Sequence, residues 1–178
     1  MEIKTIYSAD LEVYGDALVD MYIDTFSNGE SFQYHNREDT KNYLLSLLKL
    51  GYGIIAVDNE QLLGAIFLSP LSFDNLVPDD IHENFDTSHS IYVSEMMVKK
   101  SHQGRGIGKQ LLHHFLHTVD KNRFHDAFIR VWVENTSAIR LYEKVGFKMC
   151  STIEQQVLLA DKSKIANFRK YYLHLALK

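Results

Sequence analysis

The sequence contains a single cysteine and has no apolar run long enough to cross a bilayer. One cysteine, Cys150, excludes an internal disulfide framework and suits a reducing, cytoplasmic setting. We expect Cys150 to be a small buried hydrophobic residue rather than a nucleophile. Residues 1–4 lack the basic start and the apolar stretch of a secretion signal. These absences predict a cytoplasmic protein with no membrane partner.

Basic residues are missing from the middle of the chain, where no Lys or Arg occurs between Leu50 and Val98. Residues 1–98 hold four Lys or Arg and 17 Asp or Glu, whereas residues 99–178 hold 15 Lys or Arg and six Asp or Glu. The net charge of the whole chain is −4. One interpretation is a protein that binds an anion at one end and attracts a cation at the other. The alternative is a solvated surface whose charge happens to be uneven.

What the sequence does contain is the composition of an ordinary globular domain, with 178 residues of which 46% are hydrophobic and 24% charged. We expect a single domain over residues 1–178. A tight hairpin in the first half and strand–helix–strand units in the second predict an α/β fold, a mixed sheet of about seven strands with helices on both faces. The predicted strands are residues 3–7, 52–57, 61–68, 91–98, 127–133, 147–152 and 170–177; the predicted helices are residues 11–26, 37–50, 109–121 and 136–145; residues 69–90 are expected to form a loop.

The most informative segment is the glycine-rich turn Gln103-Gly104-Arg105-Gly106-Ile107-Gly108, between a predicted strand and a predicted helix. Such a turn leaves backbone N–H groups free at the positive end of the helix dipole, which is a ready anion site. The spacing is neither Gly-x-Gly-x-x-Gly, which indicates dinucleotide binding, nor the nucleotide-triphosphate loop. The turn therefore predicts a phosphate-bearing cofactor of another kind.

Two segments together resemble a known family, the GNAT superfamily of Gcn5-related N-acetyltransferases. Residues 98–112 resemble its acetyl-CoA motif, Gln/Arg-x-x-Gly-x-Gly/Ala, at Gln103, Gly106 and Gly108. Residues 135–147 resemble its second cofactor-side motif, Asn-x-x-Ala-x-x-x-Tyr-x-x-x-Gly-Phe. The order of the predicted elements also agrees with the family. The resemblance implies a GNAT-type fold and acetyl-CoA as the acetyl donor.

The resemblance also implies which residues contact the donor. The turn amides would hold the pyrophosphate, and backbone groups of Met96 and Val98 would pair with the pantetheine arm as an added strand does. The Met96 amide would polarise the thioester carbonyl. Asn135 would hydrogen-bond the cofactor arm, or cap the helix that follows, or both. The full expected cofactor-binding set is Met96, Met97, Val98, Gln103, Gly104, Arg105, Gly106, Ile107, Gly108, Lys109, Asn135, Ser137 and Tyr142.

Three residues are the expected catalytic set: Tyr142, Glu95 and Met96. Tyr142 matches the family position that protonates the leaving thiolate, and the alternative is a tyrosine that only packs in the core. An amine must be neutral to attack, so a base is needed, and Glu95 is the carboxylate on the motif strand. The alternative for Glu95 is a solvated, outward-facing side chain.

The acceptor is expected to bind against residues 26–36 and 71–90. Candidate contacts are Phe32, Tyr34, Phe73, Tyr92 and Glu95. The acidic residues of segment 71–90 would attract a cationic amine, or they are a solvated loop, and they argue against nucleic-acid and acidic-peptide acceptors. No metal is expected, because the His113/His117 pair lacks a third ligand and is better interpreted as surface helix.

The leading functional hypothesis is direct transfer of acetyl from acetyl-CoA to a primary amine of a small molecule or peptide, in a ternary complex. The alternatives are a non-catalytic acyl-CoA sensor, and an acyltransferase that uses another acyl donor or a hydroxyl acceptor. A homodimer through the last strand is also plausible for the family.

Overall fold

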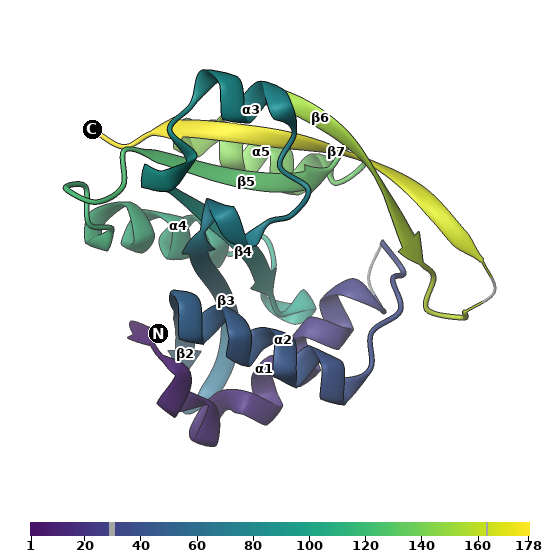
Figure 1. Cartoon of the computed structure of the whole chain (residues 1–178). Helices are drawn as coiled ribbons and strands as arrows, with labels where there is room; N and C mark the ends of the chain where they lie inside the picture. Colours follow the sequence, from purple (N-terminus) through teal and green to yellow (C-terminus); the bar gives the residue numbers. More distant parts are fainter. Residues whose placement is uncertain (29–30, 163) are drawn as a thin grey trace.

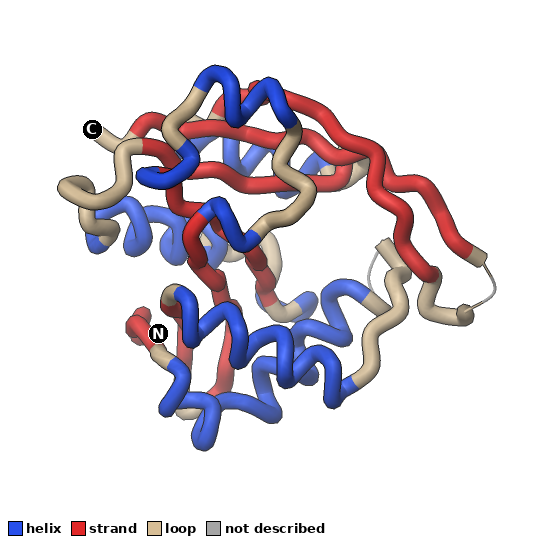
Figure 2. The backbone as a smooth tube through the Cα atoms, in the orientation of Figure 1, coloured by secondary structure: helices blue, strands red, loops and turns tan. Residues whose placement is uncertain are grey.

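The computed structural model describes residues 1–28, 31–162 and 164–178. Seven strands form one sheet in the order β1-β2-β3-β4-β5-β7-β6, with helices on both faces (Figures 1 and 2). The strands are β1 (Glu2–Ile6), β2 (Tyr52–Asp58), β3 (Gln61–Pro70), β4 (Ser90–Val98), β5 (Asp126–Trp132), β6 (Lys148–Leu158) and β7 (Ile165–Ala176). The helices are α1 (Leu11–Phe26), α2 (Arg37–Leu50), α3 (Asp79–Asn84), α4 (Ile107–Thr118) and α5 (Thr136–Val145). The predicted α/β fold with a mixed seven-stranded sheet is confirmed.

The sheet is antiparallel except where β4 pairs with β5 in parallel. One face is covered by α4 and α5: Leu111 and Phe115 of α4 are fully buried in a cluster with Ile129 of the sheet, and Tyr142 of α5 belongs to the same cluster. The other face is covered by α1 and α2, which bury Leu18 and Leu44. Burying apolar side chains on both faces explains why β3 is an almost continuous hydrophobic run rather than an alternating one.

Residues 69–90, expected to be a loop, contain the short helix α3 between two 3₁₀ turns. Ile81 of α3 is 1% exposed and packs with Phe128 and Tyr172 on the face that α1 and α2 share. This apolar anchor orders a segment whose other residues are mostly polar, and the helix is too short for its periodicity to be recognised in the sequence.

The last two strands are longer than predicted. They pair from Lys148↔His174 to Leu158↔Ile165 and form a hairpin that projects beyond the sheet (Figure 1). The tip of the hairpin reaches the segment between α1 and α2, where the backbone N–H of Tyr34 donates to Leu158 O at 2.7 Å. Pairing between the two strands, rather than burial, extends them, so the hydrophobic pattern underestimates their length.

A buried ion pair joins the α3 region to the sheet. Both Asp74 carboxylate oxygens accept from the Arg130 guanidinium at 3.0 Å, and the Tyr172 hydroxyl donates to Asp74 at 2.6 Å. The Asp74 side chain is 4% exposed and that of Arg130 15%. Arg130 also donates to the Tyr172 hydroxyl at 3.2 Å, and losing Asp74 would leave the guanidinium buried without its carboxylate.

We therefore expect Asp74→Ala to lower the free energy of unfolding by about 3 kcal/mol, because Arg130 is left buried without its carboxylate. For a chain of this size the melting temperature should fall by roughly 6–12 °C in a thermal denaturation experiment. Glu83→Ala, an exposed change on α3, is the matched control and should alter stability by less than about 0.5 kcal/mol. Equal melting temperatures for the two variants would show that the ion pair contributes nothing.

No helix in the described part of the chain is long and apolar enough to span a membrane. Cys150 is partly buried, its thiol donates to Tyr172 O, and burial raises its pKa to about 11. A thiol with so high a pKa is a poor nucleophile, in agreement with the structural role expected for it.

Candidate active site

β4 has one paired edge and one open edge in its second half. It pairs with β3 as far as Val98, but with β5 only from Ser90 to Val93. The β3 register shifts at this point, because Leu68 lies opposite Val93 and Phe67 opposite Glu95. A bulge of this kind bends a strand away from its neighbour. In the ranges that the structure describes, β4 therefore diverges from β5 just where the motif strand was expected to bind the donor.

The backbone groups that face the open edge can be identified from the register. The N–H of Lys99 donates to Leu63 O at 2.9 Å, so Met97 and Glu95 are the β4 residues whose backbone groups point to β3. Met96 and Val98 then point the opposite way. In agreement, Val98 O accepts from the Gln103 side-chain amide at 3.2 Å rather than from β3. An extended chain with amide groups, such as pantetheine, fits this edge as an added strand.

The glycine-rich turn lies at the end of this edge and starts α4. Gly104 and Gly106 adopt positive φ of 75° and 80°, and a β-carbon at either position would meet no atom within 4 Å. Their backbone conformation demands glycine, and the space beside them is open to a ligand. At Gly108, by contrast, a β-carbon would lie 2.6 Å from Met96 Cε, so the first turn of α4 packs closely on β4. The free N–H groups of that turn suit a pyrophosphate.

The first turn of α5 is capped by Asn135. Its Oδ1 accepts from the backbone N–H of Ala138 at 3.2 Å and from the Ser137 hydroxyl at 3.1 Å. The capping interpretation of Asn135 is therefore confirmed. Its contact with the donor stays a prediction, as does that of Ser137. Arg105 and Lys109 are exposed beside the turn, where long cations can reach phosphate groups.

Tyr142, on α5, is 6% exposed and packs edge-on against Phe147, with 6.3 Å between ring centroids. No hydrogen-bond partner of its hydroxyl is found among residues 1–28, 31–162 and 164–178. Burial, together with the negative charge of Glu95, raises the pKa of Tyr142 above its ordinary value of 10.0. The phenol therefore keeps its proton at neutral pH and senses the Glu95 charge.

Glu95 is held by two phenols from the helices on the opposite face. Its Oε1 accepts from the Tyr43 hydroxyl of α2 at 2.8 Å and from the Tyr22 hydroxyl of α1 at 3.3 Å. Burial raises the pKa of Glu95 to about 7, while the Tyr43 hydrogen bond and the positive charges of Lys170 and Arg130 oppose that rise. The carboxyl is thus poised to exchange a proton near neutral pH. It is not the solvated surface residue that was the alternative.

Tyr22 and Tyr43 are functional candidates that the sequence did not single out. Both fit the apolar stripes of amphipathic helices, so their periodicity predicts core packing. The only signal in the sequence is that a buried tyrosine needs a partner for its hydroxyl.

The expected acceptor contacts fall into two groups. Phe73 lies 6.3 Å from the Tyr43 ring, and Tyr92, 5% exposed, is on the same strand as Glu95, so both belong to the surroundings of the carboxyl. Phe32 and Tyr34 lie further out, at the junction with the β6–β7 hairpin, where Phe32 O accepts from Ala160 N and Lys162 Nζ sits 4.3 Å above the Tyr34 ring. The hairpin itself was not expected at the acceptor side.

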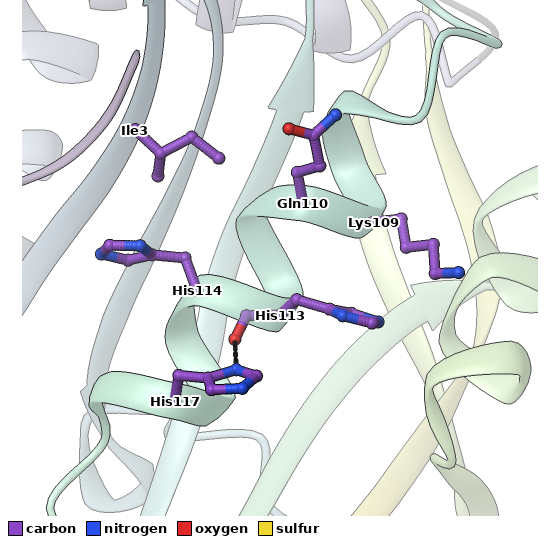
Figure 3. A pocket seen from close by; sticks show the side chains of 6 residues that line it. All are labelled: Ile3, Lys109, Gln110, His113, His114 and His117. Carbon is purple, nitrogen blue, oxygen red and sulfur yellow. Dashed lines mark hydrogen bonds between the residues drawn. The ribbon is translucent and has the colours of Figure 1, made fainter. Parts of the chain in front are cut away.

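The histidines of α4 lie on its outward face, away from Glu95. They border an open depression of about 590 Å³ (Figure 3), and the His117 ring donates to His113 O at 2.7 Å. No group of three His, Cys, Asp or Glu side chains arranged for a metal occurs in the described residues. The residues of this depression are Ile3, Lys109, Gln110, His113, His114 and His117.

Comparison with known proteins agrees with this geometry. The family model described as "Acetyltransferase (GNAT) family" matches residues 15–147, which is three quarters of the chain. The chain belongs to the GNAT family. GNAT proteins are acetyltransferases that use acetyl-CoA as the donor, so the predicted family, enzyme class and cofactor are confirmed.

Individual GNAT relatives are distant. N-alpha-acetyltransferase 40 of Saccharomyces cerevisiae is 31% identical over 73% of this chain, and the match covers 49% of that protein, so the chain spans about half the length of this curated relative. The structure of ribosomal-protein-alanine N-acetyltransferase from Brucella melitensis has a TM-score of 0.73 at 20% identity, with 99% of this chain and all of that chain covered. The structure of yncA from Salmonella typhimurium with its cofactor acetyl-CoA has a TM-score of 0.73 at 16% identity, covering 100% and 94%. These two structures share the GNAT fold with the chain.

Proposed function

We propose that this protein moves the acetyl group of acetyl-CoA to a primary amine of a small molecule or peptide, by direct attack in a ternary complex. The observation that carries the proposal is the open β4 edge at Met96, which has a poised carboxyl, Glu95, on one side and a protonated phenol, Tyr142, on the other. A base, a backbone donor and an acid around one point are what acyl transfer to an amine requires.

Each residue then has a defined task. Glu95 accepts a proton from the acceptor ammonium, directly or through a water, because only the neutral amine has a lone pair. The Met96 N–H points out of the open edge and can donate to the carbonyl oxygen on which negative charge develops. As the new C–N bond forms and the C–S bond breaks, Tyr142 gives its proton to the departing sulfur, and the second proton lost by the nitrogen returns to Tyr142 through water. Acetyl-CoA, when bound, supplies the activated thioester.

The α-amine of a peptide or amino acid is the acceptor we favour. The named relatives are an N-alpha-acetyltransferase and a ribosomal-protein-alanine N-acetyltransferase, which supports a peptide amine. The segment between α1 and α2 meets the β6–β7 hairpin where Gln33 pairs with Leu159. An extended peptide could contact both the segment and the hairpin.

A thiol-release assay with acetyl-CoA and a panel of α-amines, ε-amines, polyamines and alcohols tests the proposal. We expect turnover with α-amines and a mass increase of one acetyl group on the acceptor. Binding of CoA without turnover on any acceptor, unchanged by Tyr142→Phe, would favour the sensor alternative instead. Other acyl-CoA donors in the same assay address the second alternative.

Donor binding should depend on the conformation of Gly106. We expect Gly106→Ala to raise the KM for acetyl-CoA about tenfold, because an L-residue at a φ of 80° costs roughly 1–2 kcal/mol and its methyl group enters the open space of the turn. Steady-state kinetics with varied donor would measure the change. Gly15→Ala, in the middle of α1 with its β-carbon in ordinary contact, is the matched control and should leave the donor KM unchanged. A Gly106→Ala enzyme with wild-type KM would contradict phosphate binding at this turn.

The quaternary structure and location stay predictions. β7 is inside the sheet between β5 and β6, so β6 is the edge strand through which a homodimer could form. Sedimentation analysis would decide whether the protein is dimeric.

A further inference from the structure

Lys170, on β7, is a partly buried cation at the acceptor side of the site. It lies opposite Trp132 in the sheet register. It is two positions from Tyr172 on the same strand, so both side chains lie on the face that carries α1, α2 and α3. It is partly buried, and no hydrogen bond or ion pair of its ammonium is found in the described residues. Burial and the charge of Arg130 lower its pKa to about 8, while the negative charges of Glu95 and Asp74 oppose that fall. A half-buried ammonium that no carboxylate contacts directly is stabilised if a ligand supplies one.

His35, between α1 and α2, faces the same region. Its ring packs edge-on against Tyr22 with 4.9 Å between centroids, and its Nε2 is buried without a hydrogen-bond partner. Burial lowers the pKa of His35, and the charge of Lys170 lowers it further, so the two side chains are electrostatic neighbours. A buried ring nitrogen without a hydrogen bond is a second polar group that an entering ligand could satisfy.

The other charges of the cluster are already matched. Arg130 is paired with Asp74, and Tyr172 donates to the same carboxylate. Glu95 receives both of its phenol hydrogen bonds on Oε1, which leaves Oε2 for the acceptor amine. Lys170 also influences the pKa of Glu95, so the free carboxylate oxygen and the free ammonium belong to one polar site.

We propose that Lys170, assisted by His35, binds a carboxylate carried by the acceptor next to its reactive amine, and so selects acidic acceptors. The proposal rests on the proposed function, since it assigns the acceptor of that same site. Glu95 would bind the acceptor's ammonium group and Lys170 its carboxylate, so the site would complement a molecule that carries one positive and one negative charge. The carboxylate could be the α-carboxylate of a free amino acid or an acidic side chain at the first or second residue of a peptide.

The acidic segment 71–90 opposes such an acceptor less than its composition indicates. Asp74 is neutralised by Arg130, Asp80 accepts from the Ser151 hydroxyl at 3.0 Å, and Asp86 contacts His89 at 2.8 Å. The hairpin beside the site also carries the exposed Lys162 and Lys164. Part of the negative charge of the segment is therefore matched within the fold, and cations stand beside the site.

Paired acceptors that differ only in the carboxylate provide the test. The pairs are an amino acid and its amide, and C-terminally amidated peptides with Glu or Gln at the first or at the second position, each assayed for kcat/KM with saturating acetyl-CoA. We expect the carboxylate member of at least one pair to be preferred about tenfold or more. The pair that shows the preference identifies the source: the amino-acid pair indicates the α-carboxylate, and a peptide pair indicates the side chain.

Variants at Lys170 separate recognition from a structural role. Lys170→Met should bring the kcat/KM ratio of the preferred pair near one, and Lys170→Arg should restore the preference. The ratio is the readout because a change in the Glu95 pKa affects both members of a pair equally. Arg169→Met, the adjacent residue on the opposite face, is the matched control and should keep the wild-type ratio.

Two results would overturn the inference while leaving the proposed function intact. One is a wild-type enzyme that uses the neutral member equally well or better in every pair. The other is a Lys170→Met enzyme that loses activity equally on both members. If wild type turns over no amine at all, the proposed function fails, and calorimetric binding of the same pairs in the presence of CoA then decides the inference by itself.

Discussion

Replacing Glu95 with glutamine is expected to lower kcat/KM about 10²- to 10³-fold, with the donor KM unchanged. Glutamine keeps the shape of the side chain, and its amide oxygen can still accept from Tyr43 and Tyr22, so the variant removes the proton acceptor and little else. Stopped-flow or coupled thiol-release kinetics with a fixed α-amine acceptor would measure the loss. Glu143→Gln, an exposed change on α5, is the matched control and should retain wild-type activity.

The pH dependence gives a sharper signature than the rate. Burial raises the pKa of Glu95 to about 7, and the base works only when ionised, so it loses activity as the pH falls through 7. Because Glu95 takes the proton of the bound ammonium, the reacting pair is ionised Glu95 with the ammonium, and log kcat/KM for wild type should rise with a slope of about one and level off near pH 7. Glu95→Gln must use the free amine, whose pKa is about 8, so its log kcat/KM should keep rising to about pH 8. Identical pH profiles for the two enzymes would remove Glu95 from the role of base.

Stability should change in the opposite direction to activity. The pKa of Glu95 is raised above its ordinary value of 4.5, so the folded state favours the protonated carboxyl. Between pH 4.5 and 7 this group makes the protein less stable as the pH rises, and above 7 the full cost remains. Glu95→Gln should consequently melt no lower than wild type at pH 8, which shows that its lost activity is not lost folding.

The surroundings of β4 illustrate how much the sequence alone could predict. The glycine-rich turn and the Asn135–Tyr142 segment were recognisable because local spacing defines them, and local spacing also predicted α1, α2, α4 and α5. The partners of Glu95 were not predictable in this way. Tyr43 and Tyr22 are 52 and 73 positions away from it, and only the packing of α1 and α2 on the sheet brings them to the carboxyl.

Charge composition alone cannot identify the site for a related reason. The acidic residues of segment 71–90 look like a binding surface for a cation, yet Asp74 is matched by Arg130, 56 positions further along the chain. Lys170 shows the reverse case, since nothing in its neighbourhood in the sequence marks it as a partly buried cation close enough to Glu95 to affect its pKa. The order of charges along the sequence does not show which of them form pairs in the folded protein, and the charge of a site depends on that pairing.

Tyr142→Phe is expected to lower kcat about 10²-fold while the KM values for donor and acceptor change by less than about threefold. The phenol keeps its proton because burial and the Glu95 charge raise its pKa, so it is a proton donor throughout the usable pH range. A thiolate that leaves without that proton carries its charge into an apolar cluster, which is unfavourable. Rapid-quench kinetics, which resolve acetyl transfer from product release, would show whether the chemical step is the one slowed.

Packing cannot explain such a loss, because phenylalanine fills the same space in the cluster that contains Phe147. The melting temperature should stay close to that of wild type, since no hydrogen bond of the hydroxyl within the described residues is removed. Tyr171→Phe on β7 is the control for loss of a hydroxyl near the same cluster and should leave kcat unchanged. If Tyr142→Phe retained full activity, Tyr142 would be a core residue, and water entering beside the open β4 edge would have to protonate the leaving sulfur.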